Sequence, residues 1–66
     1  MNWIFTIYNK NNKVVETLRI MNRTDSEANK EAESYMENVS PYNNGKYSFT
    51  IVHSEKTEEF LILKEL

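Results

Sequence analysis

With 66 residues and no cysteine, this chain can build one small hydrophobic core, without disulfides to stabilise it or thiolates to bind a metal. The net charge of −2 gives no overall attraction to nucleic acid, and no apolar run approaches the roughly 18 residues of a membrane span. Residues 2–8 lack the basic flank and the cleavage site of a signal peptide. We therefore expect a single domain over residues 1–66, located in the cytoplasm and not in a membrane.

Two strands joined by a polar turn are predicted at the start of the chain. Residues 3–8 alternate aromatic and β-branched side chains, which is typical of a strand, and residues 13–21 resume the alternation. The run Asn-Lys-Asn-Asn at 9–12 favours a turn, because Asn tolerates positive φ and bonds its own backbone. We expect a β-hairpin, whose register stays open because both faces of its second strand carry apolar residues.

One amphipathic helix is predicted over residues 24–39. Five apolar side chains recur there at helical spacing: Ala28, Ala32, Tyr35, Met36 and Val39. Thr24 and Glu27 match a capping box at the start, and Pro41 prevents continuation at the end. Residues 25–37 hold five acids and one lysine, a net charge of −4, whereas residues 1–24 hold four cations and one acid, a net charge of +3.

A third strand is predicted over residues 46–53, after the turn signal Asn44-Gly45. The apolar run at 60–63 is open to two interpretations, a strand over 59–64 or a helix over 57–66, and the short preceding loop favours the strand. The predicted fold class is α+β, with the order ββαββ. It is a small, antiparallel-rich sheet of three or four strands with one amphipathic helix packed on one face.

Both faces of the predicted sheet carry apolar side chains. Toward the helix we expect Trp3, Phe5, Ile7, Leu18, Ile20, Tyr47, Phe49 and Ile51. The other face keeps several large apolar residues, and exposed apolar surface of this kind usually marks an interface. We therefore predict that the chain can self-associate, as a homo-oligomer, near Tyr8, Val15, Met21 and Val52.

Catalytic and metal-binding residue sets are not recognisable in this sequence. His53 is the only histidine, and its spacing from serines, threonines and acids does not suggest a triad. The carboxylates Glu55, Glu58 and Glu59 near it are better explained as solvated charge. A single glycine cannot build a glycine-rich phosphate loop. We expect a protein that is not an enzyme and that uses no cofactor and no metal.

The remaining pattern predicts a small protein–protein interaction module. A row of acidic side chains on a helix can face a basic groove of another protein, and we expect partner contacts at Glu31, Glu33, Glu37 and Tyr42. Frequent Asn, Lys, Glu and Ile are typical of AT-rich coding sequences, so a phage-type inhibitor that docks on a host or defence protein is one possible form.

Nucleic-acid binding is the alternative interpretation. Lys10, Lys13, Arg19 and Arg23 would form a basic N-terminal hairpin that contacts phosphates. Four cations are a modest footprint, however, and the acidic helix would repel phosphates. We therefore rank this alternative below protein binding.

Overall fold

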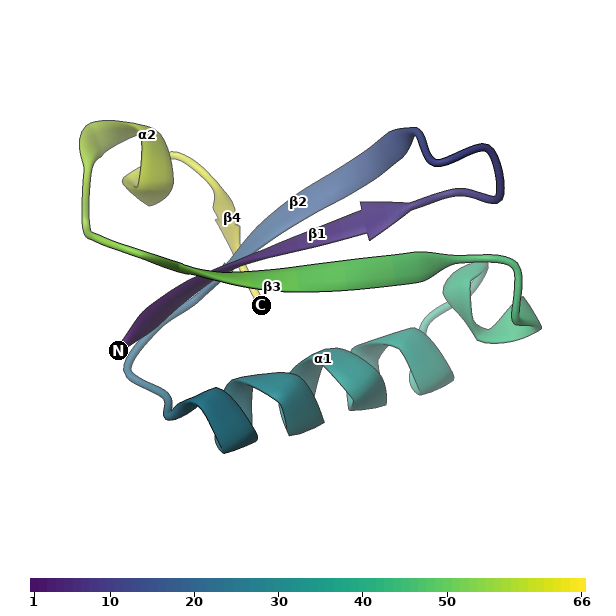
Figure 1. Ribbon diagram of the computed structural model, residues 1–66, viewed down its shortest axis with the longest axis horizontal. Helices are drawn as coiled ribbons and strands as arrows, with labels where there is room; N and C mark the ends of the chain where they lie inside the picture. The colour runs from purple at the N-terminus through teal and green to yellow at the C-terminus, as the bar shows by residue number, and fades with distance from the viewer.

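The computed structural model describes all 66 residues as a four-stranded sheet with one long helix across one face (Figure 1). In chain order the elements are β1 (Asn2–Tyr8), β2 (Val14–Ile20), α1 (Asp25–Asn38), the single 3₁₀ turn η1 (Tyr42–Asn44), β3 (Ser48–Ser54), α2 (Glu58–Leu61) and β4 (Lys64–Glu65). The predicted α+β class and the ββαββ order are confirmed.

The sheet has the strand order β3-β1-β2-β4. β1 is antiparallel to both of its neighbours, and β4 adds a short parallel pairing to β2, so the sheet is mixed. The register that the sequence left open is set by a bulge: Ile7 stands opposite Glu16 and Tyr8 opposite Val14, which leaves Val15 as the extra residue. β1 and β3 pair without interruption along seven residues.

The hydrophobic core lies between the sheet and α1, as the apolar stripe predicts. Eight buried side chains form it: Trp3, Phe5, Ile7, Leu18, Ile20, Ala28, Ala32 and Met36. The other three residues expected on this face, Tyr47, Phe49 and Ile51, pack against its border and are only partly buried. The two alanines let the helix approach the large β1 side chains closely, which is why small and large residues face each other here.

The start of α1 is capped as predicted. The Glu27 N–H donates to Thr24 Oγ1 (3.2 Å), and the Thr24 N–H donates to Glu27 Oε1 (2.9 Å), so both halves of the capping box are present. The indole Nε1 of Trp3 donates to the carbonyl of Arg23 (3.0 Å), which ties the segment before the helix to the first strand.

The prediction of a strand over residues 59–64 is wrong. Thr57 caps the short helix α2 by accepting a hydrogen bond from the Phe60 N–H (3.2 Å), and only Lys64–Glu65 form a strand. The physical reason is the burial of one aromatic ring. A strand would send Phe60 and Ile62 to the same face, whereas the helical turn buries Phe60 to 1% exposure and leaves Ile62 83% exposed.

Candidate functional site

β3 lies at one edge of the sheet and pairs only with β1. In antiparallel sheets, successive residues direct their backbone N–H and C=O groups alternately toward one neighbouring strand and the other. Two hydrogen bonds just beyond the ends of β1 show which residues bond to β2. The Arg23 N–H donates to the Met1 carbonyl, and the Asn9 N–H donates to the Lys13 carbonyl. The odd-numbered residues of β1 therefore direct their backbone N–H and C=O groups toward β2. The even-numbered residues of β1 therefore bond to β3.

This alternation also determines which backbone groups of β3 are free. Even-numbered residues of β3 stand opposite even-numbered residues of β1, as Thr50 does opposite Thr6, and use their N–H and C=O groups on that strand. The backbone groups of Phe49, Ile51 and His53 therefore point away from the sheet, and no loop hydrogen bond reaches them. Three alternate residues with free donors and acceptors are what an added strand pairs with.

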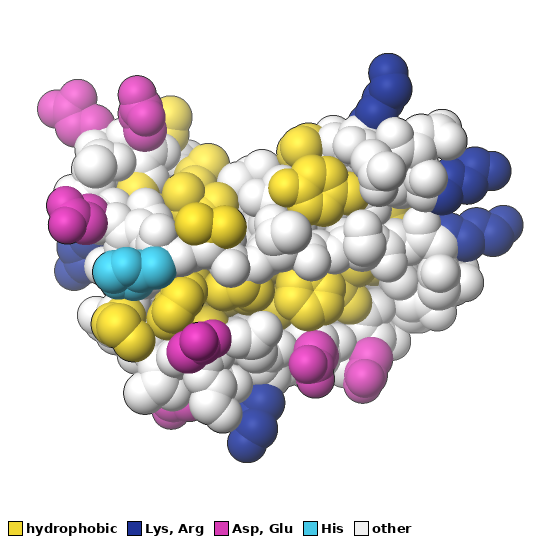
Figure 2. Space-filling view, viewed as in Figure 1, with side chains coloured by type: hydrophobic (Ala, Val, Ile, Leu, Met, Phe, Trp, Pro, Cys, Tyr) yellow, Lys and Arg dark blue, Asp and Glu magenta, His cyan; other side chains and the backbone are white.

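The β3 edge lacks the features that usually protect an exposed strand. Its sequence, SFTIVHS, holds no lysine, no proline and no acid, and its pairing with β1 has no bulge. In Figure 2, hydrophobic side chains gather along the line between β3 and α1, and the only histidine of the chain, His53, is exposed at one end of the strand. Nothing in the chain covers this edge.

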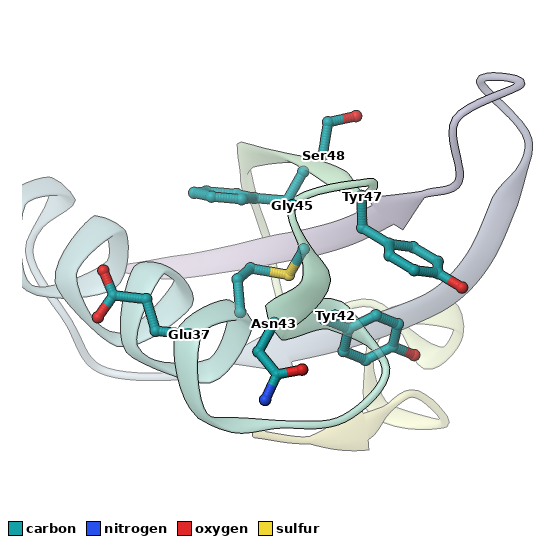
Figure 3. Close-up of a pocket in the computed structure, with 8 residues that line it drawn as sticks. Glu37, Tyr42, Asn43, Gly45, Tyr47 and Ser48 are labelled. Carbon is teal, nitrogen blue, oxygen red and sulfur yellow. The ribbon is translucent and has the colours of Figure 1, made fainter.

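An open groove of about 470 Å³ lies beside the first half of β3. It is bordered by the end of α1, by η1 and by the start of β3, and its apolar lining comes from Met36, Tyr42, Tyr47 and Phe49. In Figure 3, Glu37 projects from α1 on one side of the groove, and the two tyrosines stand on the other. A side chain from an added strand would have an aromatic surface to contact here.

A polar cluster anchors the aromatic side of this groove. The hydroxyls of Tyr35 and Tyr42 both donate to Glu16 Oε1, at 3.1 and 2.9 Å. Burial, and then the Glu16 carboxylate, raise the pKa of Tyr42 to about 12, and the same two causes raise the pKa of Tyr35. Tyr42 also packs against Tyr47 with ring centroids 5.1 Å apart. The Tyr42 side chain, predicted as a partner contact, thus has its hydroxyl engaged within the fold.

Sequence reasoning missed Glu16 and Tyr35 as members of this cluster. Helical spacing places Tyr35 in the apolar stripe, and Glu16 enters the sequence analysis only as one charge of residues 1–24. The sequence does contain one sign that Glu16 has a structural role, because it is an acid in a strand of mostly apolar residues. Which face of the sheet the Glu16 side chain occupies, however, depends on the bulge at Val15.

The acidic residues of α1 do not form one surface. Glu31 Oε2 lies 2.9 Å from Arg23 Nε, so Glu31 is paired on the flank of the helix that faces the end of β2. Glu33 is two residues further on, about 200° around the helix, and Glu37 borders the groove beside β3. The structure thus brings Glu33 and Glu37 to one side and places Glu31 on another.

The four cations of the alternative interpretation are also divided. Lys10 and Lys13 lie at the exposed tip of the hairpin, where Lys10 lines a polar pocket with Lys46. Arg19 lies near the far end of β2, where its Nη1 donates to the Leu61 carbonyl (2.6 Å) and its Nη2 is 3.6 Å from Glu65. Together with the pairing of Arg23, these contacts give two of the four cations structural roles within the fold.

The second face of the sheet is partly covered by the chain itself. Phe60 and Leu63 lie over this face, where they line a pocket together with Ile4 and Thr17. Of the residues predicted for self-association, Val15 and Val52 are exposed, and Tyr8 and Met21 are half-buried. Met21 lies beyond the end of β2, away from the hairpin tip that holds Tyr8 and Val15. The four residues are spread across this face, not gathered in one patch.

Groups of three or more histidine, aspartate or glutamate side chains that would suit a metal ion do not occur in the structure. The ring of His53 packs edge-on against Trp3, with centroids 5.4 Å apart. Neither helix has the length and apolar character that a membrane span requires.

Comparison of the chain with protein-family models, with curated proteins and with solved structures gave no match.

Proposed function

We propose that this protein is a non-enzymatic protein–protein interaction module that binds its partner by strand addition at β3. The observation that carries the proposal is the free backbone of Phe49, Ile51 and His53 on a strand without a lysine, proline or bulge. Main-chain hydrogen bonds supply much of the affinity when a strand is added to such an edge. Neighbouring pockets then supply specificity.

The groove beside the edge supports the same proposal. An added strand places alternate side chains on the helix side of the sheet, and those next to Phe49 would reach the surface formed by Met36, Tyr42 and Tyr47. We extend the proposal to a cytoplasmic location and to a phage-type inhibitor that docks on a host or defence protein. The partner contacts at Glu33 and Glu37 fit this proposal, since Glu37 borders the groove.

Affinity capture with two matched lysine variants tests the proposal. Thr50→Lys with Val52→Lys places two charges on exposed positions of β3, and Val14→Lys with Val15→Lys adds the same charge to exposed positions of β2. We expect the β3 variant to lose the protein that the wild type captures from a lysate of the source organism, and the β2 variant to retain it. Equal capture by both variants would exclude the edge.

The same experiment separates the nucleic-acid alternative. If captured material is released by nuclease and by raised salt, and if Lys10→Ala with Lys13→Ala weakens it while the β3 lysines do not, then the hairpin tip is the binding surface.

A further inference from the structure

The sequence of β3 is nearly symmetric about its central residue. When two copies of SFTIVHS run antiparallel with Ile51 opposite Ile51, Ser48 meets Ser54, Phe49 meets His53 and Thr50 meets Val52. We propose that the occupant of the β3 edge is a second copy of this chain, paired in this register across a two-fold axis at Ile51. This inference rests on the proposed function and names its partner. The two four-stranded sheets join into one of eight strands.

The free backbone groups fit this register. Phe49, Ile51 and His53 stand opposite His53, Ile51 and Phe49 of the second copy, so every free N–H of one strand meets a free C=O of the other. A shift of one residue would set these groups against residues that already bond to β1. A shift of two residues would leave one of the three without its counterpart. The register at Ile51 is the one that satisfies all three residues of both strands.

The side chains fit it as well. On the helix side the Phe49 ring meets the His53 ring and Ile51 meets Ile51, and on the other side Thr50 meets Val52, both β-branched. Cross-strand pairs of these kinds stabilise antiparallel sheets. Because SFTIVHS holds no acid, lysine or arginine, no like charges stand opposite each other. The pairing also covers Phe49 and Ile51, which are only partly buried in a single chain.

The pairing places the two helices on the same face of the joined sheet. The buried side chains of α1 pack on those of β1 and β2, and its backbone also comes close to β3. A closed two-fold pair also removes the exposed edge, and with nine of 66 residues buried, a single chain gains from the added interface.

Complementary charge at the centre of the interface tests this inference. Thr50 and Val52 are exposed, and the hydrogen bond between the hydroxyls of Thr50 and Tyr8 (3.3 Å) is exposed as well. We therefore expect the chain to fold with either lysine or glutamate at both positions, which circular dichroism checks. We expect wild-type protein to have twice the mass of one chain by light scattering. The T50K/V52K and T50E/V52E variants are each monomers, because like charges then face each other twice. An equimolar mixture of the two variants restores the doubled mass.

Cysteine pairing tests the register, since the chain contains no cysteine of its own. Thr50 and Val52 of the second copy form a non-hydrogen-bonded pair, with Cα atoms about 4.5 Å apart, which a disulfide can bridge. A mixture of Thr50→Cys and Val52→Cys chains forms the mixed disulfide. Thr50→Cys alone does not, since its sulfurs would be diagonal neighbours about 7–8 Å apart.

The outcomes separate this inference from the proposed function. Wild-type protein that stays a monomer at its highest soluble concentration, or a T50K/V52K variant that still has the doubled mass, overturns the second copy as occupant. Capture of another protein that is lost in the same variant then leaves the proposed function standing. Capture that is unaffected by the β3 lysines overturns the proposed function itself.

Discussion

The hydroxyl of Tyr42 donates a hydrogen bond of 2.9 Å to a carboxylate oxygen of Glu16, 26 residues earlier in the chain. Tyr35 donates to the same oxygen at 3.1 Å. These bonds join η1 and the end of α1 to β2, and they hold the aromatic wall of the groove beside the β3 edge. The geometry of the candidate site therefore depends on one carboxylate of the hairpin.

Replacement of Tyr42 by Phe removes one of these bonds and keeps the ring. A hydrogen bond of this kind contributes about 1 kcal/mol, and we expect the free energy of unfolding, measured with urea, to fall by about that amount. Tyr47→Phe is the matched control, because its ring packs in the same aromatic cluster and its hydroxyl has no hydrogen-bond partner. Equal losses in the two variants would show that the bond to Glu16 contributes nothing.

Alkaline pH should weaken the fold through the same tyrosines. Burial and Glu16 raise the pKa of Tyr42 from 10.0 to about 12, so the folded chain holds this proton more tightly than the unfolded chain. The resulting stability is fully present below pH 10 and is lost as the pH rises toward 12. Thermal unfolding should show this decline in the wild type, and a smaller one in Tyr42→Phe, where Tyr35 still contributes. An identical decline in both proteins would contradict the assignment.

The capping box should be measurable as a stability contribution. Thr24→Ala removes the acceptor of the Glu27 N–H, and loss of such a cap lowers the free energy of unfolding by about 1 kcal/mol. Ser26→Ala is the control, as an exposed residue of the same turn that is not the cap. Hydrogen bonds from Thr24 hold the pKa of Glu27 below its ordinary 4.5. Thr24→Ala keeps the backbone N–H that donates to Glu27 and loses only the side-chain bond. A part of the difference between wild type and Thr24→Ala should therefore shrink as acid protonates Glu27.

Phe60 should hold the C-terminal segment on the second face of the sheet. Phe60→Ala empties a site where the ring is 1% exposed, and we expect a loss of about 3 kcal/mol in the free energy of unfolding. Leu61→Ala, at a 47% exposed side chain, is the control and should change little. Hydrogen exchange gives a local readout, because the Leu66 N–H donates to the Arg19 carbonyl and should exchange faster in Phe60→Ala. Unchanged exchange there would mean that Arg19 alone holds the segment.

The division of the acidic residues also gives a prediction. Glu33→Ala with Glu37→Ala should weaken binding of a partner protein seated on the β3 side, whereas Glu31→Ala should not, because Glu31 faces Arg23 on the other flank. The ion pair is partly exposed, so its loss should lower stability by less than about 1 kcal/mol. Titration of the captured partner against the two variants makes the comparison. If Glu31→Ala weakens partner binding more than Glu33→Ala with Glu37→Ala does, the contact surface lies on the β2 flank of the helix instead.

Local patterns predicted the elements that depend on residues close in sequence. The stripe from Ala28 to Met36 and the Thr24–Glu27 cap are set by neighbours three or four positions away. The apolar run at 60–63 was ambiguous for the same reason, because its length suits a strand and its Thr57 cap suits a helix. Burial of Phe60 against the far face of the sheet decided between them, and two of the residues it meets there, Ile4 and Thr17, lie 56 and 43 positions earlier.

By itself, then, the sequence determined one capped amphipathic helix, three strands in order and a core of named apolar residues, because periodicity and capping are short-range effects. Only the tertiary structure decided which strand would be left at the edge. It also decided that Val15 would bulge, that Glu16 would meet two tyrosines and that Glu31 and Glu37 would lie on different sides of α1. Each of these depends on pairing between segments far apart in the chain, where small differences in packing and hydrogen bonding select one register among several that the local pattern allows.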